Sequence, residues 1–228
     1  GIDLGTMETS LLKVRLLGPV EITYEGQPLK IRRRMERAIL YYLAAENRPV
    51  SRTTLIDLLW PDDDEIDHRG ALRTALSRLR SRLPEEDLLV SELDQVWLDP
   101  DHCWVDVIKF QTSFSSLKNV LGVYQDDRAL PAQIAKQIEE TLSLCRGDRF
   151  LHGDNLSAYP EIESWVHTFN LTLTHQRTTL MERLAQHYRA SGQLELALDL
   201  YKQLGRMDLL DVSTHLAVLE ILSRMNRY

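Results

Sequence analysis

The amino-acid sequence predicts an α+β domain followed by an all-α domain. Two observations support this fold class. Strand-like and helix-like segments alternate over residues 11–108, whereas only helical patterns occur from residue 109 onward. A third observation concerns charge: the segment 69–83 contains five arginines and no acid, although the chain as a whole carries a net charge of −7. Positive charge is therefore concentrated locally in an acidic protein.

The N-terminal part begins with an unpatterned stretch and continues with strands. Residues 1–10 are small and polar, and we expect them to be disordered; the part before Met7 is typical of a tag remnant. Apolar and polar residues then alternate over residues 11–24, with turn signals between them, and residues 29–31 complete a small β-meander.

Three helices are predicted after the meander. The first begins near Arg34 and ends before residue 47, and the second is capped by Ser51 and stops before Pro61. The third covers residues 68–83. An acidic loop at residues 62–65 precedes this third helix, Asp67 is expected to cap it, and Pro84 ends it.

A β-hairpin is predicted after the third helix, with strands at residues 88–91 and 96–99, and one more strand follows near residues 103–107. The order of meander, three helices and hairpin is that of a winged helix-turn-helix with an N-terminal β-sheet, spanning residues 11–108.

The third helix combines an apolar stripe with an arginine-rich surface. Four leucines recur at the spacing that places them on one side of a helix, namely Leu72, Leu76, Leu79 and Leu83. With about 100° per residue, the positions opposite this stripe are Gly70, Thr74, Ser77 and Ser81. A helix with one buried side and cations on the rest has the form of a DNA recognition helix. The alternative is a solvated surface helix whose arginines pair with the acids at residues 62–65 or 85–87.

Several segments in the same order resemble a known family. They are residues 16–22 (Leu-Leu-Gly-Pro-Val-Glu-Ile), 37–40 (Arg-Ala-Ile-Leu), 49–56 (Pro-Val-Ser-Arg-Thr-Thr-Leu-Ile), 59–61 (Leu-Trp-Pro) and 76–80 (Leu-Ser-Arg-Leu-Arg). The chain is similar over nearly its whole length to the SARP regulators of actinomycetes. In that family an OmpR/PhoB-type winged helix precedes a bacterial transcriptional activation domain.

The resemblance extends into the second domain. Val105, Asp106 and Phe110 resemble the hinge between the two domains, and residues 146–151 with Trp165 resemble landmarks of the activation domain. The resemblance implies tetratricopeptide-like helix pairs over residues 109–228. The small and aromatic positions of such a repeat are matched by Ala185, Tyr188, Ala197 and Tyr201, with Gly192 in the turn. A plain helical hairpin would explain one such match equally well. The last helix, from Val212, has no C-cap, which we interpret as truncation of a longer chain.

The resemblance also implies which residues contact DNA. Its base and backbone contacts fall on Arg73, Thr74, Ser77 and Arg78. We assign Arg73 and Arg78 to base edges in the major groove, with Thr74 and Ser77 supporting them. We assign phosphates to Arg69, Arg80 and Arg82. Arg33 and Arg34, at the start of the first helix, either touch the DNA backbone or form a solvated cluster.

One segment departs from the family pattern. The expected wing tip, residues 91–95, carries Glu92 and Asp94 where a cation commonly enters the minor groove. Carboxylates at this place repel phosphate, so we expect the wing to add little affinity.

The predicted function is that of a sequence-specific transcriptional activator in the bacterial cytoplasm. Its partners would be double-stranded DNA with promoter repeats, RNA polymerase and a second copy of the chain in a homodimer. No stretch of about 18 apolar residues predicts a membrane span. The two cysteines, Cys103 and Cys145, are far apart, which suits a reducing compartment.

Catalysis, cofactors and metals are not predicted. The sequence has no phosphate-binding glycine loop and no HExxH motif. Cys145 and His152 have no second pair that would complete a zinc site. Two alternatives to the DNA-binding activator stay open. One is a protein-interaction or signal-sensing module with a degenerate winged helix, favoured by the acidic wing; the other is control by a further C-terminal domain.

Overall fold

The computed structural model describes residues 11–61, 68–124, 128–207 and 212–225. These residues form two compact units. The first unit contains the described residues up to Ile108 together with residues 146–170, and the second contains the rest. The chain therefore passes between the units three times. Residues 146–170 were predicted to belong to the helical domain, but they make most of their contacts with the first unit.

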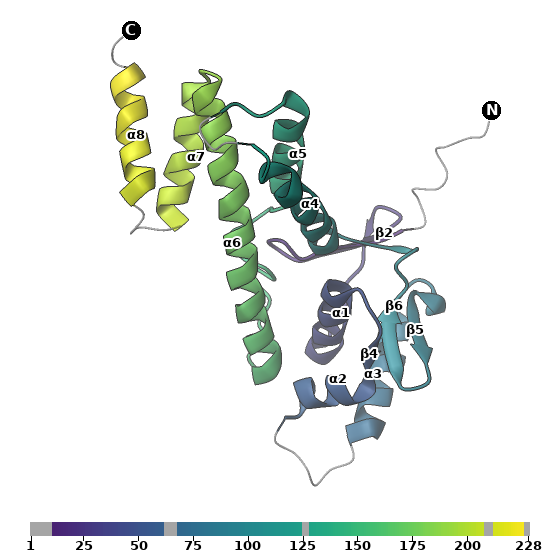
Figure 1. Cartoon of the computed structure of the whole chain (residues 1–228). Coiled ribbons are helices and arrows are strands. Elements are labelled where there is room, and N and C mark those ends of the chain that lie inside the picture. The colour runs from purple at the N-terminus through teal and green to yellow at the C-terminus, as the bar shows by residue number, and fades with distance from the viewer. Residues whose placement is uncertain (1–10, 62–67, 125–127, 208–211, 226–228) are drawn as a thin grey trace, which may run out of the picture. The chain divides into compact units, whose positions relative to one another are not determined.

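The first unit has the predicted order of strands and helices (Figure 1). Its elements are β1 (Leu12–Arg15), β2 (Glu21–Tyr24), β3 (Gln27–Pro28), α1 (Arg34–Glu46), β4 (Val50–Ser51), α2 (Arg52–Leu59), α3 (His68–Arg82), a single 3-10 turn (Glu86–Leu88), β5 (Leu89–Glu92), β6 (Gln95–Leu98) and β7 (Cys103–Val105). The predicted cap of the second helix is confirmed, because the Ser51 hydroxyl accepts a hydrogen bond from the Thr54 amide at 3.0 Å. The acidic loop and Asp67 lie outside the described residues.

The strands form two sheets. The N-terminal sheet has the order β3-β2-β1-β7, in which β1 pairs antiparallel with β2 and parallel with β7. The second sheet has the order β4-β6-β5, so the β5–β6 hairpin gains a short third strand that directly precedes α2. The meander and the hairpin were predicted from local alternation, whereas the pairings of β4 and β7 were not.

Asp106 connects the N-terminal sheet to the helix that follows it. Its side chain accepts three backbone hydrogen bonds, from Leu16, Leu17 and Val107, at distances of 2.8–3.0 Å. The residue is 1% exposed, and burial raises the pKa of Asp106, although the three N–H donors oppose that shift. Asp106 also accepts from the Val107 amide in the first turn of α4, and this helix begins four residues earlier than the pattern from Phe110 onward suggested.

Residues 146–156, here called the strap, lie along the segment that follows β1. Three backbone N–H groups of the strap donate to carbonyls of that segment at 2.8–2.9 Å. The donor–acceptor pairs are Arg146 with Leu17, Leu151 with Leu16, and His152 with Gly18. Gly18 has a φ of +122°, and a Cβ at this position would lie 2.7 Å from the Gly147 nitrogen. The two backbones approach so closely that only glycine fits at residue 18.

The strap also pairs with α1. Asp154 accepts two hydrogen bonds from the Arg37 guanidinium, at 3.0 and 3.1 Å, and one from the Tyr41 hydroxyl at 2.6 Å. Burial and this carboxylate together raise the pKa of Tyr41. Phe150 is buried and meets Trp165 edge to face at a centroid distance of 5.3 Å. Residues that resemble activation-domain landmarks thus complete the core around α1.

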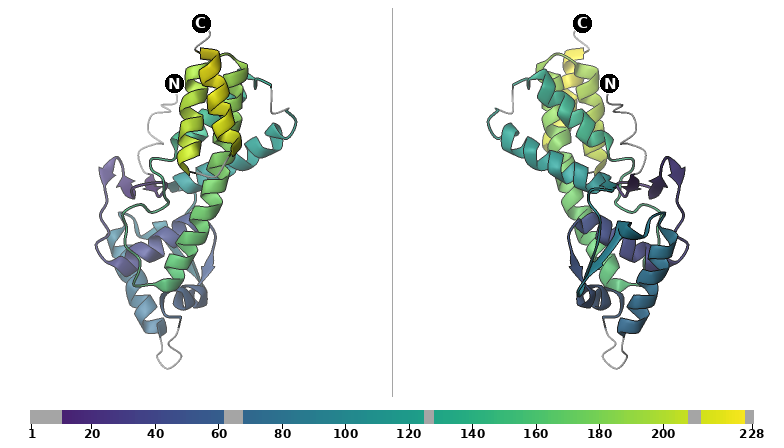
Figure 2. Two further views of the ribbon diagram at one scale, coloured as in Figure 1. Left: turned by 90° about the vertical axis from the view of Figure 1, so that its left-hand side faces the viewer. Right: turned by 90° about the vertical axis from the view of Figure 1, so that its right-hand side faces the viewer.

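The second unit is helical. Its elements are α4 (Asp106–Leu121), whose first three residues belong to the first unit, α5 (Ala132–Ser143), the part of α6 (Pro160–Ala190) from Leu171 onward, α7 (Leu194–Met207) and α8 (Val212–Met225). Figure 2 shows α7 and α8 side by side with this part of α6. Ala185, Ala197 and Tyr201 share one buried cluster and Tyr188 packs against it, as the repeat pattern predicted. Gly192 forms the turn with a φ of +77°. No helix in the described parts of the chain is long and apolar enough to cross a membrane.

We expect Asp106→Asn to destabilise the first unit. An amide offers one acceptor oxygen where the carboxylate offers two, and its NH2 group would face a backbone N–H. The free energy of unfolding should fall by about 2–4 kcal/mol in chemical denaturation. The exposed Asp101→Asn serves as the matched control. Equal stability of the two variants would show that the carboxylate does not hold these segments.

His187 makes the second unit sensitive to acid. The Leu130 amide donates to its Nδ1 at 3.0 Å, which requires an uncharged nitrogen. Burial, together with nearby Arg183, lowers the pKa of His187. The folded state therefore favours the neutral ring, so its stabilising contribution is present above the unfolded pKa and is lost as the pH falls.

The midpoint of thermal unfolding should consequently drop between about pH 7.5 and about pH 5.5. His187→Asn keeps an acceptor but cannot titrate, so it should reduce this drop, whereas the exposed His175→Asn should not. An unchanged pH profile in His187→Asn would assign the acid sensitivity to other groups.

Candidate nucleic-acid interface

α3 has one buried and one exposed side. The buried residues are His68, Leu72, Ala75, Leu76 and Leu79, and Leu83 just beyond the helix is buried too. The exposed residues are Arg69, Gly70, Ala71, Arg73, Thr74, Ser77, Arg78, Ser81 and Arg82. The predicted leucine stripe is thus part of the core. Of the residues that we assigned to DNA on this helix, only Arg80 is half-buried.

The neighbouring helix fixes the N-terminal end of α3. The Trp60 indole, at the end of α2, stacks on the His68 imidazole with a centroid distance of 4.6 Å and an interplanar angle of 5°. This contact joins the two helices on either side of residues 62–67, and α3 packs against both α1 and α2. The exposed side of α3 is therefore presented on a rigid base.

The charges on the exposed side are open to solvent. Among the described residues, no ion pair joins Arg73, Arg78 or Arg82 to a carboxylate. Glu85, one of the acids considered as a partner, instead accepts a hydrogen bond from the Tyr24 hydroxyl. Within the described residues, these guanidinium groups have no ion pair to break before they contact phosphate or a base edge.

The hydroxyl groups of α3 are mostly committed as donors. Thr74 donates to the Gly70 carbonyl at 3.0 Å, and Ser81 donates to the Arg78 carbonyl at 2.8 Å. Each oxygen keeps lone pairs that can accept from a donor such as the N4 amino group of cytosine or the N6 amino group of adenine. Thr74 can therefore support base recognition as an acceptor.

Arg80 connects α3 to the β5–β6 hairpin. Its guanidinium donates to the Leu89 carbonyl at 3.0 Å and to the Ser91 hydroxyl at 2.9 Å, both in β5. We assigned Arg80 to phosphate from its sequence position alone. In the structure these two hydrogen bonds also fix the hairpin beside α3.

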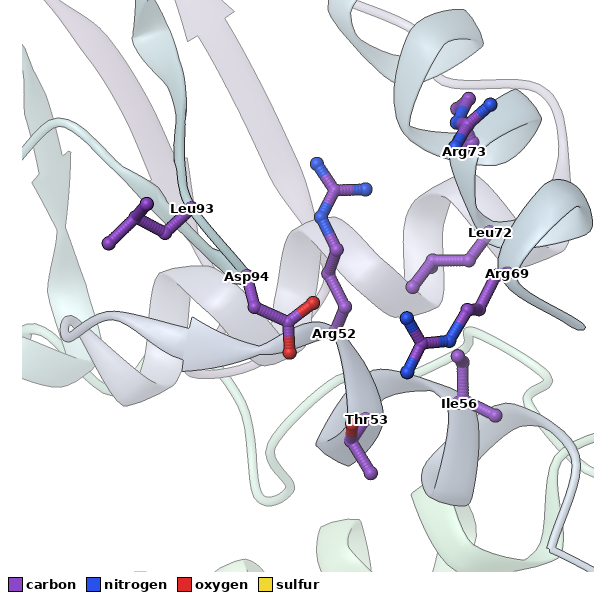
Figure 3. Close-up of a pocket in the computed structure, with 8 residues that line it drawn as sticks. All are labelled: Arg52, Thr53, Ile56, Arg69, Leu72, Arg73, Leu93 and Asp94. Carbon is purple, nitrogen blue, oxygen red and sulfur yellow. The ribbon is translucent and has the colours of Figure 1, made fainter.

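A cleft of about 330 Å³ separates α3 from the hairpin turn (Figure 3). Arg69 and Arg73 project from α3, and Arg52 projects from the first turn of α2. Leu93 and Asp94 line the hairpin side of the cleft, where the Leu93 side chain points away from the arginines. The remaining lining residues are Thr53, Ile56 and Leu72. Arg52 and Leu93 were missed in the sequence. Arg52 directly follows the Ser51 cap, so the sequence identifies it as the first residue of a helix. Anions bind at helix N-termini, which is the signal that could have drawn attention to Arg52.

Arg33 and Arg34 lie apart from this cleft, at the start of α1. Both are exposed, and no side chain caps this helix. Arg32 lines a different cleft of about 520 Å³, together with Lys30 and Arg37. Lys30, Arg32 and Arg37 thus form a cationic group separate from the one on α2 and α3, which lines the cleft beside the hairpin.

Three comparisons with known proteins bear on this arrangement. Residues 26–97 match the family model of the transcriptional regulatory protein, C terminal. These residues form the winged helix-turn-helix. The match starts in the turn before β3 and ends in β6, so it includes α1, α2, α3 and the hairpin. It confirms the winged-helix part of the resemblance seen in the sequence.

A solved structure shares the fold over both parts of the chain. The structure of Mycobacterium tuberculosis EmbR in complex with a low affinity phosphopeptide superposes with a TM-score of 0.55 and is 19% identical in sequence. The match covers 93% of this chain and 65% of that chain. At this identity the likeness establishes the fold, a winged helix followed by helices, as predicted. No curated protein sequence matches.

The described residues contain no group of three or more His, Cys, Asp or Glu side chains arranged to hold a metal ion. Cys103 and Cys145 form no disulfide bond within the described residues, and burial raises the pKa of Cys103 to about 12. At neutral pH Cys103 is therefore protonated and unreactive.

We expect Arg80→Ala to loosen the hairpin. The substitution removes two hydrogen bonds and should lower the free energy of unfolding by about 1–2 kcal/mol, with faster hydrogen exchange in β5. Arg82→Ala, on the same helix but exposed, should change stability by less than about 0.5 kcal/mol. If both variants unfold alike, Arg80 does not anchor the hairpin.

Proposed function

We propose that this protein is a sequence-specific DNA-binding transcriptional regulator that acts as an activator and reads promoter repeats. In this proposal α3 enters the major groove. The supporting observation is the division of α3: its leucine side is buried, and its opposite side carries arginines that are exposed and, among the described residues, unpaired with acids at Arg73, Arg78 and Arg82. The match of residues 26–97 to a transcriptional-regulator domain supports the same function.

The residues of α3 divide into two roles. Arg73 and Arg78 contact base edges, preferably guanine N7 and O6, and Thr74 and Ser77 assist them. Arg69 and Arg82 contact phosphates, and Arg52 at the start of α2 joins them on the same cleft. Arg80 contributes to the positive electrostatic potential of this surface, while its guanidinium is hydrogen-bonded to the Leu89 carbonyl of β5. Arg33 and Arg34 contact the backbone only where the DNA extends to the start of α1.

The partners beyond DNA follow from the same proposal. An activator in the bacterial cytoplasm contacts RNA polymerase, and repeated half-sites are read by two copies of the chain. The helical second unit is the part that is free to carry these contacts or a signal input.

A second candidate is a protein-interaction or signal-sensing module that does not bind DNA specifically. Its support is the hairpin turn, where Glu92 and Asp94 are exposed beside the cleft, and the net charge of −7. This candidate predicts no specific DNA affinity at about 0.15 M salt. A pull-down with and without nuclease separates the two candidates.

We expect Arg73→Ala to relax sequence preference. The test begins with selection of duplexes from a random pool by the wild-type chain, followed by affinity measurements by fluorescence anisotropy. Loss of a bidentate base contact should cost about 1–3 kcal/mol on the selected duplex and little on unrelated duplexes.

Arg82→Ala is the matched control for this experiment. It should weaken binding to all duplexes alike and lower the slope of log affinity against log salt by about one unit. If both variants bind every duplex as the wild type does, α3 does not contact DNA.

A further inference from the structure

A second cleft of the first unit, of about 520 Å³, combines cationic and apolar side chains. Its walls are the segments 19–22 and 29–32, α1 and the strap. None of the residues assigned to DNA lines it. Its volume falls within the range of small-molecule sites, which is about 300–1,000 Å³.

Hydrogen bonds hold the walls of this cleft in place. The Arg37 guanidinium donates to the Arg32 carbonyl at 2.7 Å and to Asp154 of the strap at 3.0 Å, so it bridges two walls. The Leu29 amide donates to the Ile22 carbonyl at 2.8 Å, which joins the other two segments. Because groups of the chain itself fix the walls, binding of a ligand would require little further ordering.

The cleft has an excess of positive charge. Lys30 and Arg32 line it and are exposed, and among the described residues neither forms an ion pair with a carboxylate. Asp154 is the one carboxylate among the described residues that line the cleft, and it is paired with Arg37. An anionic group would therefore be attracted to Lys30 and Arg32.

Apolar side chains line much of the remaining wall. They are Pro19, Val20, Ile22, Leu29 and Ile31. Val20 and Leu29 are only half-buried, so a ligand would remove apolar surface from water here. A phosphate group or an inorganic anion would leave this surface exposed. The lining therefore fits a ligand that has an apolar body as well as an anionic group.

We propose that this cleft binds a small organic acid, a carboxylate carried on an apolar body. Lys30 and Arg32 contact the carboxylate, and the apolar side chains cover the body. Because the ligand contacts both the strap and α1, its binding stabilises the pairing of these two segments. This inference goes beyond the proposed function and does not depend on DNA binding by α3.

Displacement of a fluorescent dye from the full chain tests the proposal. The dye is 8-anilinonaphthalene-1-sulfonate, an anion with an apolar body that binds apolar surface, and octanoate should displace it. 1-Octanol lacks the charge and acetate lacks most of the apolar body, so both should displace the dye at least about tenfold more weakly.

Charge substitutions and hydrogen exchange locate the site. The double substitution Lys30→Gln and Arg32→Gln should weaken octanoate binding about tenfold, because charge-assisted contacts are lost. The matched control Arg78→Gln removes an exposed arginine of α3 and should leave octanoate affinity unchanged. In the wild type, octanoate should slow amide exchange in residues 29–32 and 152–154.

Several outcomes would overturn this inference. Equal displacement by octanoate and 1-octanol, or by octanoate and acetate, would show that the cleft does not recognise both parts of the ligand. Wild-type affinity for octanoate in the double variant, slower exchange only outside the cleft, or failure of the wild type to bind either probe would also overturn it. If the double variant binds octanoate normally but loses affinity for DNA, the two cations contact phosphate instead. Failure of Arg73→Ala and Arg82→Ala to alter DNA binding would overturn the proposed function alone.

Discussion

Three backbone amides of the first unit donate to the carboxylate of Asp106, and the other contacts of the unit depend on this interaction. The parallel pairing of Val14 with Val105 brings the end of β1 beside residue 106. The strap then follows the same segment at the close approach of Gly18 and Gly147. Through Asp154 the strap holds α1, and α1 supports α3. The orientation of the arginine-rich surface thus depends on contacts at the far side of the unit.

The local features of the fold were predictable from the sequence because each depends on neighbours within a few residues. The Ser51 cap, the leucine stripe of α3 and the Gly192 turn are of this kind. The parallel pairing of β7 with β1 and the strap were not predictable, because they join residues about 90 or more apart whose periodicity carries no mark of the partner. The resemblance of residues 146–151 to activation-domain landmarks was observed, but it does not reveal that they pair with the segment that follows β1.

The candidate site shows the same division. The outward residues of α3 followed from helical geometry alone, and the structure places them on the exposed side. The contact of Arg80 with the hairpin was not predicted, since the position of Arg80 on the helix edge does not disclose that the Leu89 carbonyl lies within reach. Arg52 and Leu93 enter the site only because β4 and the hairpin bring α2 and the turn together. EmbR shares the fold but is only 19% identical in sequence, so this likeness does not predict which residues lie on the surface of this chain.

The pairing of Arg37 and Tyr41 with Asp154 has a consequence for the order in which the protein is made. The carboxylate lies 117 residues after Arg37, beyond a segment that belongs to the other unit. While the chain emerges from the ribosome, α1 is synthesised long before Asp154. A nascent chain ending at residue 108 would leave the Arg37 guanidinium and the buried Tyr41 hydroxyl without this acceptor. The winged helix thus gains its full set of contacts only after residues 109–154 have been synthesised.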